Sequence, residues 1–208
     1  MMSKFILVFF LALTLSLTFV SCGNSGEKDM KEEVSQAPEY SPPEEPYVMD
    51  KNPHLIIETD MGDMEMELFL KESPMTASNF LYLVREGFYD GLIWHRVIPN
   101  FVIQTGDPTG TGRGGPGYTI DFEDNDKKHV PGAVAMARSK DPNSAGSQFY
   151  IALTALPQLD ASGYCVFGVL TSGLDVAKKI AAVETDSRDK PLEPVHLIRI
   201  YEKNAFTQ

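Results

Sequence analysis

The chain has 208 residues, is 43% hydrophobic and carries a formal charge of −11, which suits one globular domain of ordinary size. Its 18 basic residues are scattered among 29 acidic ones, so we expect no nucleic-acid partner, because a phosphate backbone is bound by clustered Lys and Arg. We interpret the acidity as a contribution to solubility.

The first segment, residues 1–21, has the pattern of a signal peptide. Lys4 supplies a positive charge, and residues 5–20 are without charge. This stretch is shorter than the roughly 20 apolar residues of a membrane-spanning helix, and a polar, acidic segment follows it. The pattern therefore predicts a cleaved export signal.

The end of this signal resembles a bacterial lipobox, in which a small residue precedes a Cys that takes a diacylglycerol. Ser21 and Cys22 fit that motif, whereas Phe19 stands where Leu or a smaller aliphatic residue is usual. Several acyl chains, at about 0.8 kcal/mol per buried methylene, hold a protein firmly on a bilayer. We therefore expect Cys22 to be lipidated and the protein to be an exported bacterial membrane-anchored lipoprotein, in the outer membrane or facing the periplasm. An ordinary secretory signal and an uncleaved anchor are the alternatives.

Residues 22–53 are rich in Glu, Pro, Ser and Gly and show no apolar period. Such a composition predicts a disordered tether without an apolar face to pack. The composition changes at His54, so the folded domain is expected to span residues 54–208. The second cysteine of the chain, Cys165, lies in an apolar run and is expected to be a buried small side chain.

Apolar periodicity then predicts strands and two helices. Residues 54–59 and 63–69 flank a short turn, and the second run alternates apolar with acidic residues, as in a hairpin with one buried face. The other predicted elements are a helix that starts at Pro74 with Ser73 as its cap and ends before Gly87, short strands over 94–134, a helix over 173–183 capped by Ser172, and a strand over 195–201. This arrangement favours an antiparallel barrel or sandwich with helical lids.

Two sequence patterns could suggest a cofactor or a metal, a glycine-rich segment and a set of histidines, but neither has the required context. Residues 110–115 formally contain a dinucleotide fingerprint, but a Pro-Gly pair and a strand-like run follow instead of the required helix. The histidines His54, His129 and His196 lie far apart without Cys or carboxylate spacing. We therefore expect neither a cofactor nor a metal.

The densest motifs lie in the middle of the chain, and together they resemble the cyclophilins. They are WHRVIPNFVIQTGD at 94–107, GAVAMAR at 132–138, PNSAGSQFYI at 142–151, Leu159 with Asp160, and YCVFG at 164–168. They occur in the family's order and span most of residues 54–203. The resemblance implies a mainly β fold, a closed eight-stranded antiparallel barrel capped by two α-helices, with a shallow active site on its outer wall.

The resemblance also implies a peptidyl-prolyl cis-trans isomerase that acts on proline-containing polypeptides, assists the folding of exported proteins and works as a monomer. The family's catalytic arginine falls on Arg96, and Gln104 is placed to donate to the substrate backbone. The implied substrate-binding residues are Phe101, Val102, Tyr150 and Leu159 around the proline ring, and Ala137, Arg138, Gln148 and Tyr164 along the groove.

The implied chemistry suits these residue types. Rotation about an X-Pro bond meets a barrier of about 18 to 20 kcal/mol, and no bond is cleaved, so neither a nucleophile nor a metal is needed. A guanidinium that donates to the prolyl nitrogen stabilises the twisted amide selectively. His95 is then expected to be a packed or satisfied polar residue and not a general base. A non-catalytic peptide-binding or holdase module and an adhesin-like scaffold remain alternatives, and the presence of Arg96 favours the enzyme.

Overall fold

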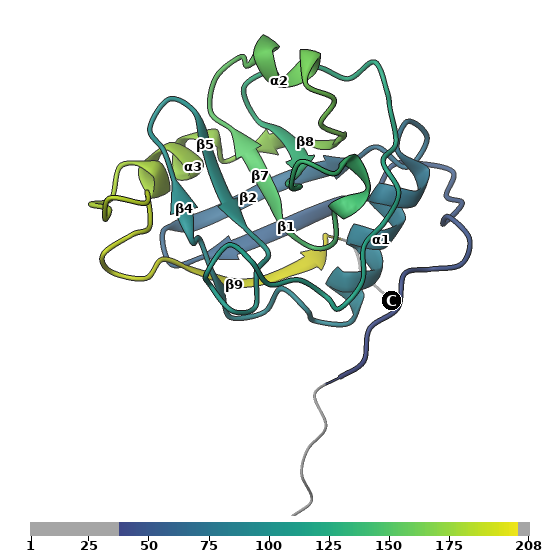
Figure 1. The fold of residues 1–208 in the computed structure, drawn as a ribbon, viewed down its shortest axis with the longest axis horizontal. Coiled ribbons are helices and arrows are strands. Elements are labelled where there is room, and N and C mark those ends of the chain that lie inside the picture. The colour runs from purple at the N-terminus through teal and green to yellow at the C-terminus, as the bar shows by residue number, and fades with distance from the viewer. Residues whose placement is uncertain (1–37, 204–208) are drawn as a thin grey trace, which may run out of the picture. The chain divides into compact units, whose positions relative to one another are not determined.

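The computed structural model describes residues 38–203, which form one nine-stranded antiparallel sheet with helices at its margins (Figure 1). The strand order is β3-β9-β1-β2-β8-β6-β7-β5-β4. The strands are β1 (His54–Thr59), β2 (Gly62–Leu68), β3 (Leu92–Ile93), β4 (Arg96–Val97), β5 (Val102–Thr105), β6 (Ala133–Met136), β7 (Phe149–Ala152), β8 (Val166–Ser172) and β9 (His196–Glu202). The predictions on residues 1–21 and Cys22 lie outside this range.

The predicted hairpin at the start of the domain is confirmed as β1 and β2. The strands pair from His54 with Glu67 to Thr59 with Gly62. Alternate residues point into the main core, where Leu55 and Met66 are fully buried, while the residues between them stay partly exposed. The period of two in the sequence therefore places the buried face of this hairpin.

Two strands that carry the site, β6 and β7, are apolar on both faces. In β7, Phe149 and Ile151 pack in the main core, whereas Tyr150 packs in a second apolar cluster on the opposite face of the sheet. The same alternation holds in β6, where Val134 lies in the main core and Ala135 in the second cluster. This second cluster lies beneath the functional site, and burial on both sides explains the unbroken apolar runs in these strands.

The predicted barrel is wrong in two respects. The sheet is a curled half-barrel of nine strands, and the described part of the chain has three α-helices: α1 (Pro74–Arg85), α2 (Pro157–Ala161) and α3 (Leu174–Ala181). The two edge strands, β3 and β4, come from one segment, residues 92–97, and do not pair with each other. They are joined through Trp94 and His95, so the chain itself and not a hydrogen-bonded ladder connects the two edges. The helix α2 is too short to produce a periodic signal.

The predicted helices exist, but their predicted caps do not. No side-chain hydrogen bond from Ser73 caps α1; the backbone N–H groups of Met75 and Thr76 instead donate to the Glu123 carboxylate, at 2.9 and 2.6 Å. Ser172 is the last residue of β8, and Gly173, with a φ of 85°, stands at the N-cap of α3. The distant loop and the glycine turn are tertiary features that local sequence does not reveal. No helix in residues 38–203 is long and apolar enough to cross a bilayer.

Contacts with the folded domain begin before residue 54. The Tyr40 ring packs edge-on against Phe88 with 5.1 Å between centroids, and the Tyr47 backbone N–H donates to Ser78 Oγ at 2.8 Å. The Arg85 guanidinium lies over the Tyr47 ring at 5.0 Å. The expectation of no apolar face to pack is therefore wrong for residues 38–53, because two tyrosines within a Pro- and Glu-rich composition suffice to attach the segment.

We expect these tyrosines to contribute to stability. The free energy of unfolding should be about 1 to 3 kcal/mol lower for a chain that starts at His54 than for one that starts at Pro38, because both ring contacts are lost. Urea denaturation of the two chains measures the difference. Equal stability would show that residues 38–53 rest on the domain without stabilising it.

Candidate active site

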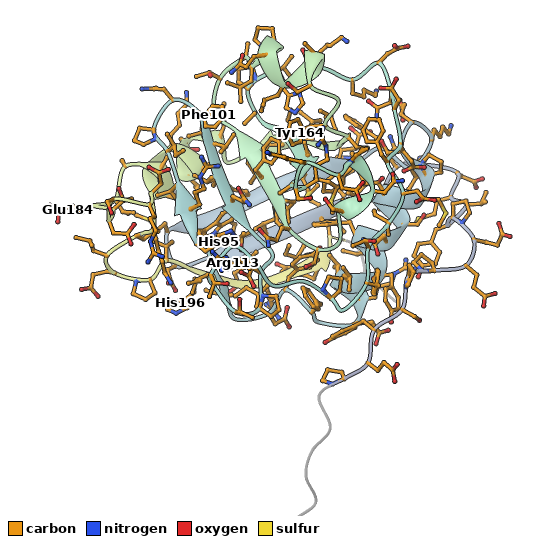
Figure 2. The ribbon with its side chains drawn as sticks, viewed as in Figure 1. His95, Phe101, Arg113, Tyr164, Glu184 and His196 are labelled. Carbon is orange, nitrogen blue, oxygen red and sulfur yellow. The ribbon has the colours of Figure 1, made fainter. Side chains whose placement is uncertain are left out.

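Nine residues, all expected at the site from the sequence, line one pocket of about 140 Å³. They are Arg96, Phe101, Val102, Gln104, Ala137, Arg138, Tyr150, Leu159 and Tyr164. Phe101 and Tyr164 are labelled in Figure 2, near the ends of the strands that carry the site. The remaining predicted residue, Gln148, lines the adjoining hollow, and its Oε1 accepts a hydrogen bond from Gln104 Nε2 at 2.9 Å. The structure thus brings all ten predicted residues together.

Strand register explains this convergence. Arg96 on β4 pairs with Gln104 on β5, Gln104 pairs with Tyr150 on β7, and Tyr150 pairs with Ala135 on β6. Side chains of directly paired residues lie on the same face of a sheet, about 4.5 to 5.5 Å apart at Cβ. One cross-strand row therefore carries a cation, an amide and an aromatic ring across the face of the site.

The loop before β9 supports Arg96 from behind. Asp189 Oδ2 lies 3.5 Å from Arg96 Nε, and the Asp189 carbonyl accepts from the Val97 N–H at 2.8 Å. Asp189 has a φ of 62°, a left-handed conformation that is costly for a residue with a side chain. The Arg96 side chain remains 40% exposed, so the guanidinium is braced on one side and accessible on the other.

A buried hydrogen-bonded chain braces two walls of the pocket. Asp160 Oδ1 lies 2.6 Å from His129 Nδ1, and His129 Nε2 lies 2.8 Å from the Tyr150 hydroxyl. Because an ionised carboxylate only accepts, Nδ1 donates to Asp160. In that neutral tautomer, Nε2 accepts from the Tyr150 hydroxyl. Burial raises the pKa of Asp160, but the hydrogen bonds from His129 outweigh it and lower that pKa overall. Asp160 follows the pocket residue Leu159, so these hydrogen bonds connect the Leu159 wall of the pocket to the Tyr150 wall.

Sequence analysis did not assign His129 to the site. A lone histidine 31 residues from its carboxylate partner carries no local signal, and only the Leu-Asp motif marked Asp160. Burial also raises the pKa of the Tyr150 hydroxyl well above its ordinary value, so the phenol stays protonated and donates.

Arg138 holds the opposite wall. Its Nη2 donates to the Ser162 carbonyl at 2.6 Å and to the Gly163 carbonyl at 3.0 Å. Its guanidinium carbon lies 4.4 Å from the centre of the Tyr164 ring. Arg138 therefore positions Tyr164 and leaves a fixed positive charge at the edge of the pocket.

The glycine-rich segment wraps around a buried carboxylate, that of Asp107, which is 1% exposed. Backbone N–H groups of Thr109, Thr111 and Arg113 donate to it at 2.7, 2.9 and 3.0 Å. A Cβ on Gly114 would lie 2.0 Å from Asp107 Oδ1, so the loop can close only with glycine there. Backbone donors of this segment thus bind an internal carboxylate.

This carboxylate should make stability depend on acid. Burial raises the pKa of Asp107, but the hydrogen bonds from Thr109 and the loop backbone hold it well below its usual range. Its contribution is full above pH about 4, the ordinary value for Asp, and is lost as pH falls toward the folded-state pKa.

Asp107→Asn should therefore reduce the free energy of unfolding at pH 7 by about 1 to 3 kcal/mol and flatten its decline between pH 5 and pH 3. Urea unfolding across this range measures both effects, and Asp126→Asn, at an exposed aspartate, is the matched control. An unchanged acid profile in Asp107→Asn would contradict the assignment.

His95 is packed, as predicted, with 5% exposure. In residues 38–203 neither of its ring nitrogens has a protein group in hydrogen-bonding geometry. Burial lowers its pKa, which keeps the ring neutral. It does not line the pocket.

Within residues 38–203, no cluster of three or more His, Cys, Asp or Glu side chains could hold a metal ion. The thiol of Cys165 is buried, and burial raises its pKa, as expected for a packing residue. The described site therefore offers a cation, amides and an apolar pocket as its chemical groups.

Comparison with known proteins identifies the family. Residues 54–202 match the family described as cyclophilin type peptidyl-prolyl cis-trans isomerase/CLD. The peptidyl-prolyl cis-trans isomerase CYP18-2 of Arabidopsis thaliana is 39% identical over 170 residues, which cover 80% of this chain and 97% of that protein. The isomerase ppi1 of Schizosaccharomyces pombe is 44% identical over 147 residues, covering 69% of this chain and 94% of that protein.

Solved structures agree. The crystal structure of the cyclophilin type isomerase cgd2_1660 of Cryptosporidium parvum superposes with a TM-score of 0.69 at 36% identity, covering 73% of this chain and 97% of that one. The same protein in the presence of the dipeptide Ala-Pro gives a TM-score of 0.68 at 37% identity, covering 72% and 98%. The chain belongs to the cyclophilin-type peptidyl-prolyl cis-trans isomerase family and is an isomerase.

Proposed function

We propose that this isomerase accelerates rotation about X-Pro bonds of exported polypeptides, with Arg96 donating to the prolyl nitrogen in the twisted state. The observation that carries the proposal is the cross-strand row, which places the Arg96 guanidinium and the Gln104 amide at the rim of the 140 Å³ pocket. The pocket combines apolar side chains, among them Phe101, Val102 and Leu159, with the polar groups of Arg96 and Gln104. The apolar side chains can pack against a proline ring while the polar groups face the peptide backbone.

The mechanism follows from what changes during rotation. As the amide twists, its nitrogen regains a lone pair, which the planar ground state lacks. A donor aimed at that nitrogen stabilises the transition state alone, and Arg stays charged at any physiological pH. Gln104, oriented by Gln148, is free to hold the neighbouring peptide group while the ring stays in the pocket. The brace between Tyr150 and Asp160 keeps the pocket walls at a fixed separation.

A protease-free assay tests this function. NMR exchange spectroscopy on an Ala-Pro-containing peptide should show cis-trans exchange accelerated by catalytic amounts of residues 38–208. Peptide binding without faster exchange would favour the holdase alternative. Absence of both would leave the scaffold alternative.

Export and anchoring are proposed from the sequence of residues 1–22. We expect Cys22→Ala to shift the protein from the detergent phase to the aqueous phase in a partition experiment, because the lipid attachment is lost. Isomerase activity should be equal in both forms, since every site residue lies beyond residue 95. Retention of Cys22→Ala on membranes would contradict lipidation.

A further inference from the structure

The proline-ring pocket opens into a second hollow of about 580 Å³. The two share three lining residues, Gln104, Ala137 and Arg138. The far wall of the second hollow is the loop 112–119, and the near wall includes Ser139 and Ser144. A peptide whose proline occupies the first pocket can therefore place a neighbouring residue in the second.

The charged side chains that line these two hollows all have the same sign. Their lining includes Arg96, Arg113 and Arg138 and contains no Asp or Glu side chain. This is unexpected in a chain with a formal charge of −11. Two other large hollows of the described domain carry an excess of acidic side chains: one is lined by Glu67 and Glu202 with Lys51, and another by Asp60, Glu184 and Glu193.

Two of these arginines have no carboxylate to neutralise them. The Arg113 side chain is exposed on the loop, and within residues 38–203 it makes neither a hydrogen bond nor an ion pair (Figure 2). Arg138 donates only to backbone carbonyls and stacks on Tyr164, contacts that fix its position without cancelling its charge. Asp121 and Glu123 line a small hollow on another side of Arg138, but within residues 38–203 neither carboxylate forms an ion pair with it.

Resting on the isomerase function proposed above, we propose that this site selects prolines that have an acidic side chain close by in the sequence. The Asp or Glu carboxylate occupies the second hollow and pairs with Arg113 and the fixed charge of Arg138. An extended peptide advances about 3.3 Å per residue, and the hollows share a wall, so the acidic residue lies within roughly two positions of the proline.

The size of the preference follows from the exposure of Arg113. An exposed ion pair contributes about 0.2 to 1 kcal/mol, and a second, fixed cation adds to it. We expect kcat/KM for a Glu peptide to exceed that of its Gln twin by about three- to tenfold at low salt. Because the groups are solvent-accessible, 0.5 M NaCl should remove most of the difference.

The test uses peptides with Glu, Gln or Lys two positions before or two positions after a single proline, followed by NMR exchange spectroscopy. The expected order is Glu above Gln above Lys in one of the two series. Equal rates for all three residues in both series, with catalysis intact, would overturn the inference and leave the isomerase function standing. Absence of catalysis on every peptide would overturn the isomerase function itself, and the inference with it.

Two variants locate the effect. Arg113→Gln should bring the Glu-to-Gln ratio close to one, whereas Lys178→Gln, the same charge change at an exposed position on α3, should leave the ratio and the rates unchanged. A ratio that persists in Arg113→Gln, or one that falls equally in Lys178→Gln, would overturn the assignment to Arg113.

Discussion

Arg96→Ala is expected to lower kcat/KM by about ten- to a hundredfold, because a hydrogen bond from a charged donor is worth about 1.5 to 3 kcal/mol. The bond forms in the transition state, so peptide affinity should change less than turnover. The fold should persist, since Arg96 and its partner Asp189 are 40% and 45% exposed. NMR exchange spectroscopy and thermal unfolding measure the two effects.

Arg96→Lys should recover little activity, because a point ammonium does not reproduce the donor geometry of a guanidinium. Arg188→Ala is the matched control: this arginine belongs to the loop beside Arg96, is 85% exposed and is not in the pocket lining. Near wild-type turnover in Arg96→Ala would contradict the catalytic role of Arg96 and favour the peptide-binding alternative.

Gly106→Ala is expected to reduce the free energy of unfolding by about 2 to 5 kcal/mol. Gly106 follows β5, has a φ of 87°, and a Cβ there would lie 2.3 Å from the Ser147 carbonyl oxygen. Both a left-handed backbone and a backbone clash oppose the alanine. The strands β5 and β7 would have to separate where they hold Gln104 and Gln148, so activity should fall as well.

Gly91→Ala separates the two causes. Gly91 also has a positive φ, 74°, but no atom lies within 4 Å of a Cβ built there. This variant should cost only the backbone term, about 1 to 2 kcal/mol. Urea unfolding of both variants gives the clash as the difference, and equal losses would show that the close approach at Gly106 is readily relaxed.

Many residues of the site were predictable because they lie in continuous sequence motifs. Arg96 and Gln104 lie in one segment, and a short turn between two strands is enough to pair them. The hairpin of β1 and β2 was predictable because one face is buried and the other solvated, which leaves a clear period of two. Such signals are local and survive in the sequence alone.

The features that were missed depend on partners far along the chain. The start of α1 is capped by Glu123 and not by Ser73, at a separation of 47 residues from Thr76. His129 connects Asp160 to Tyr150 by hydrogen bonds, but no sequence motif or residue spacing predicts this contact. The half-barrel was also missed, because whether a sheet closes depends on whether its two edge strands pair, which no motif encodes.

Because both edge strands come from one short segment, we expect the edge of the sheet to open at a lower temperature than its centre. The strand β4 pairs through only two residues, Arg96 with Gln104 and Val97 with Ile103. Short edge strands open locally at a lower free energy than the sheet as a whole. Arg96, the proposed catalytic cation, therefore lies on the margin of the fold. On warming, we expect activity to be lost while β1, β2 and β8 are still intact, together with fast exchange of the Ile98 amide, which donates to the Val102 carbonyl at 2.9 Å.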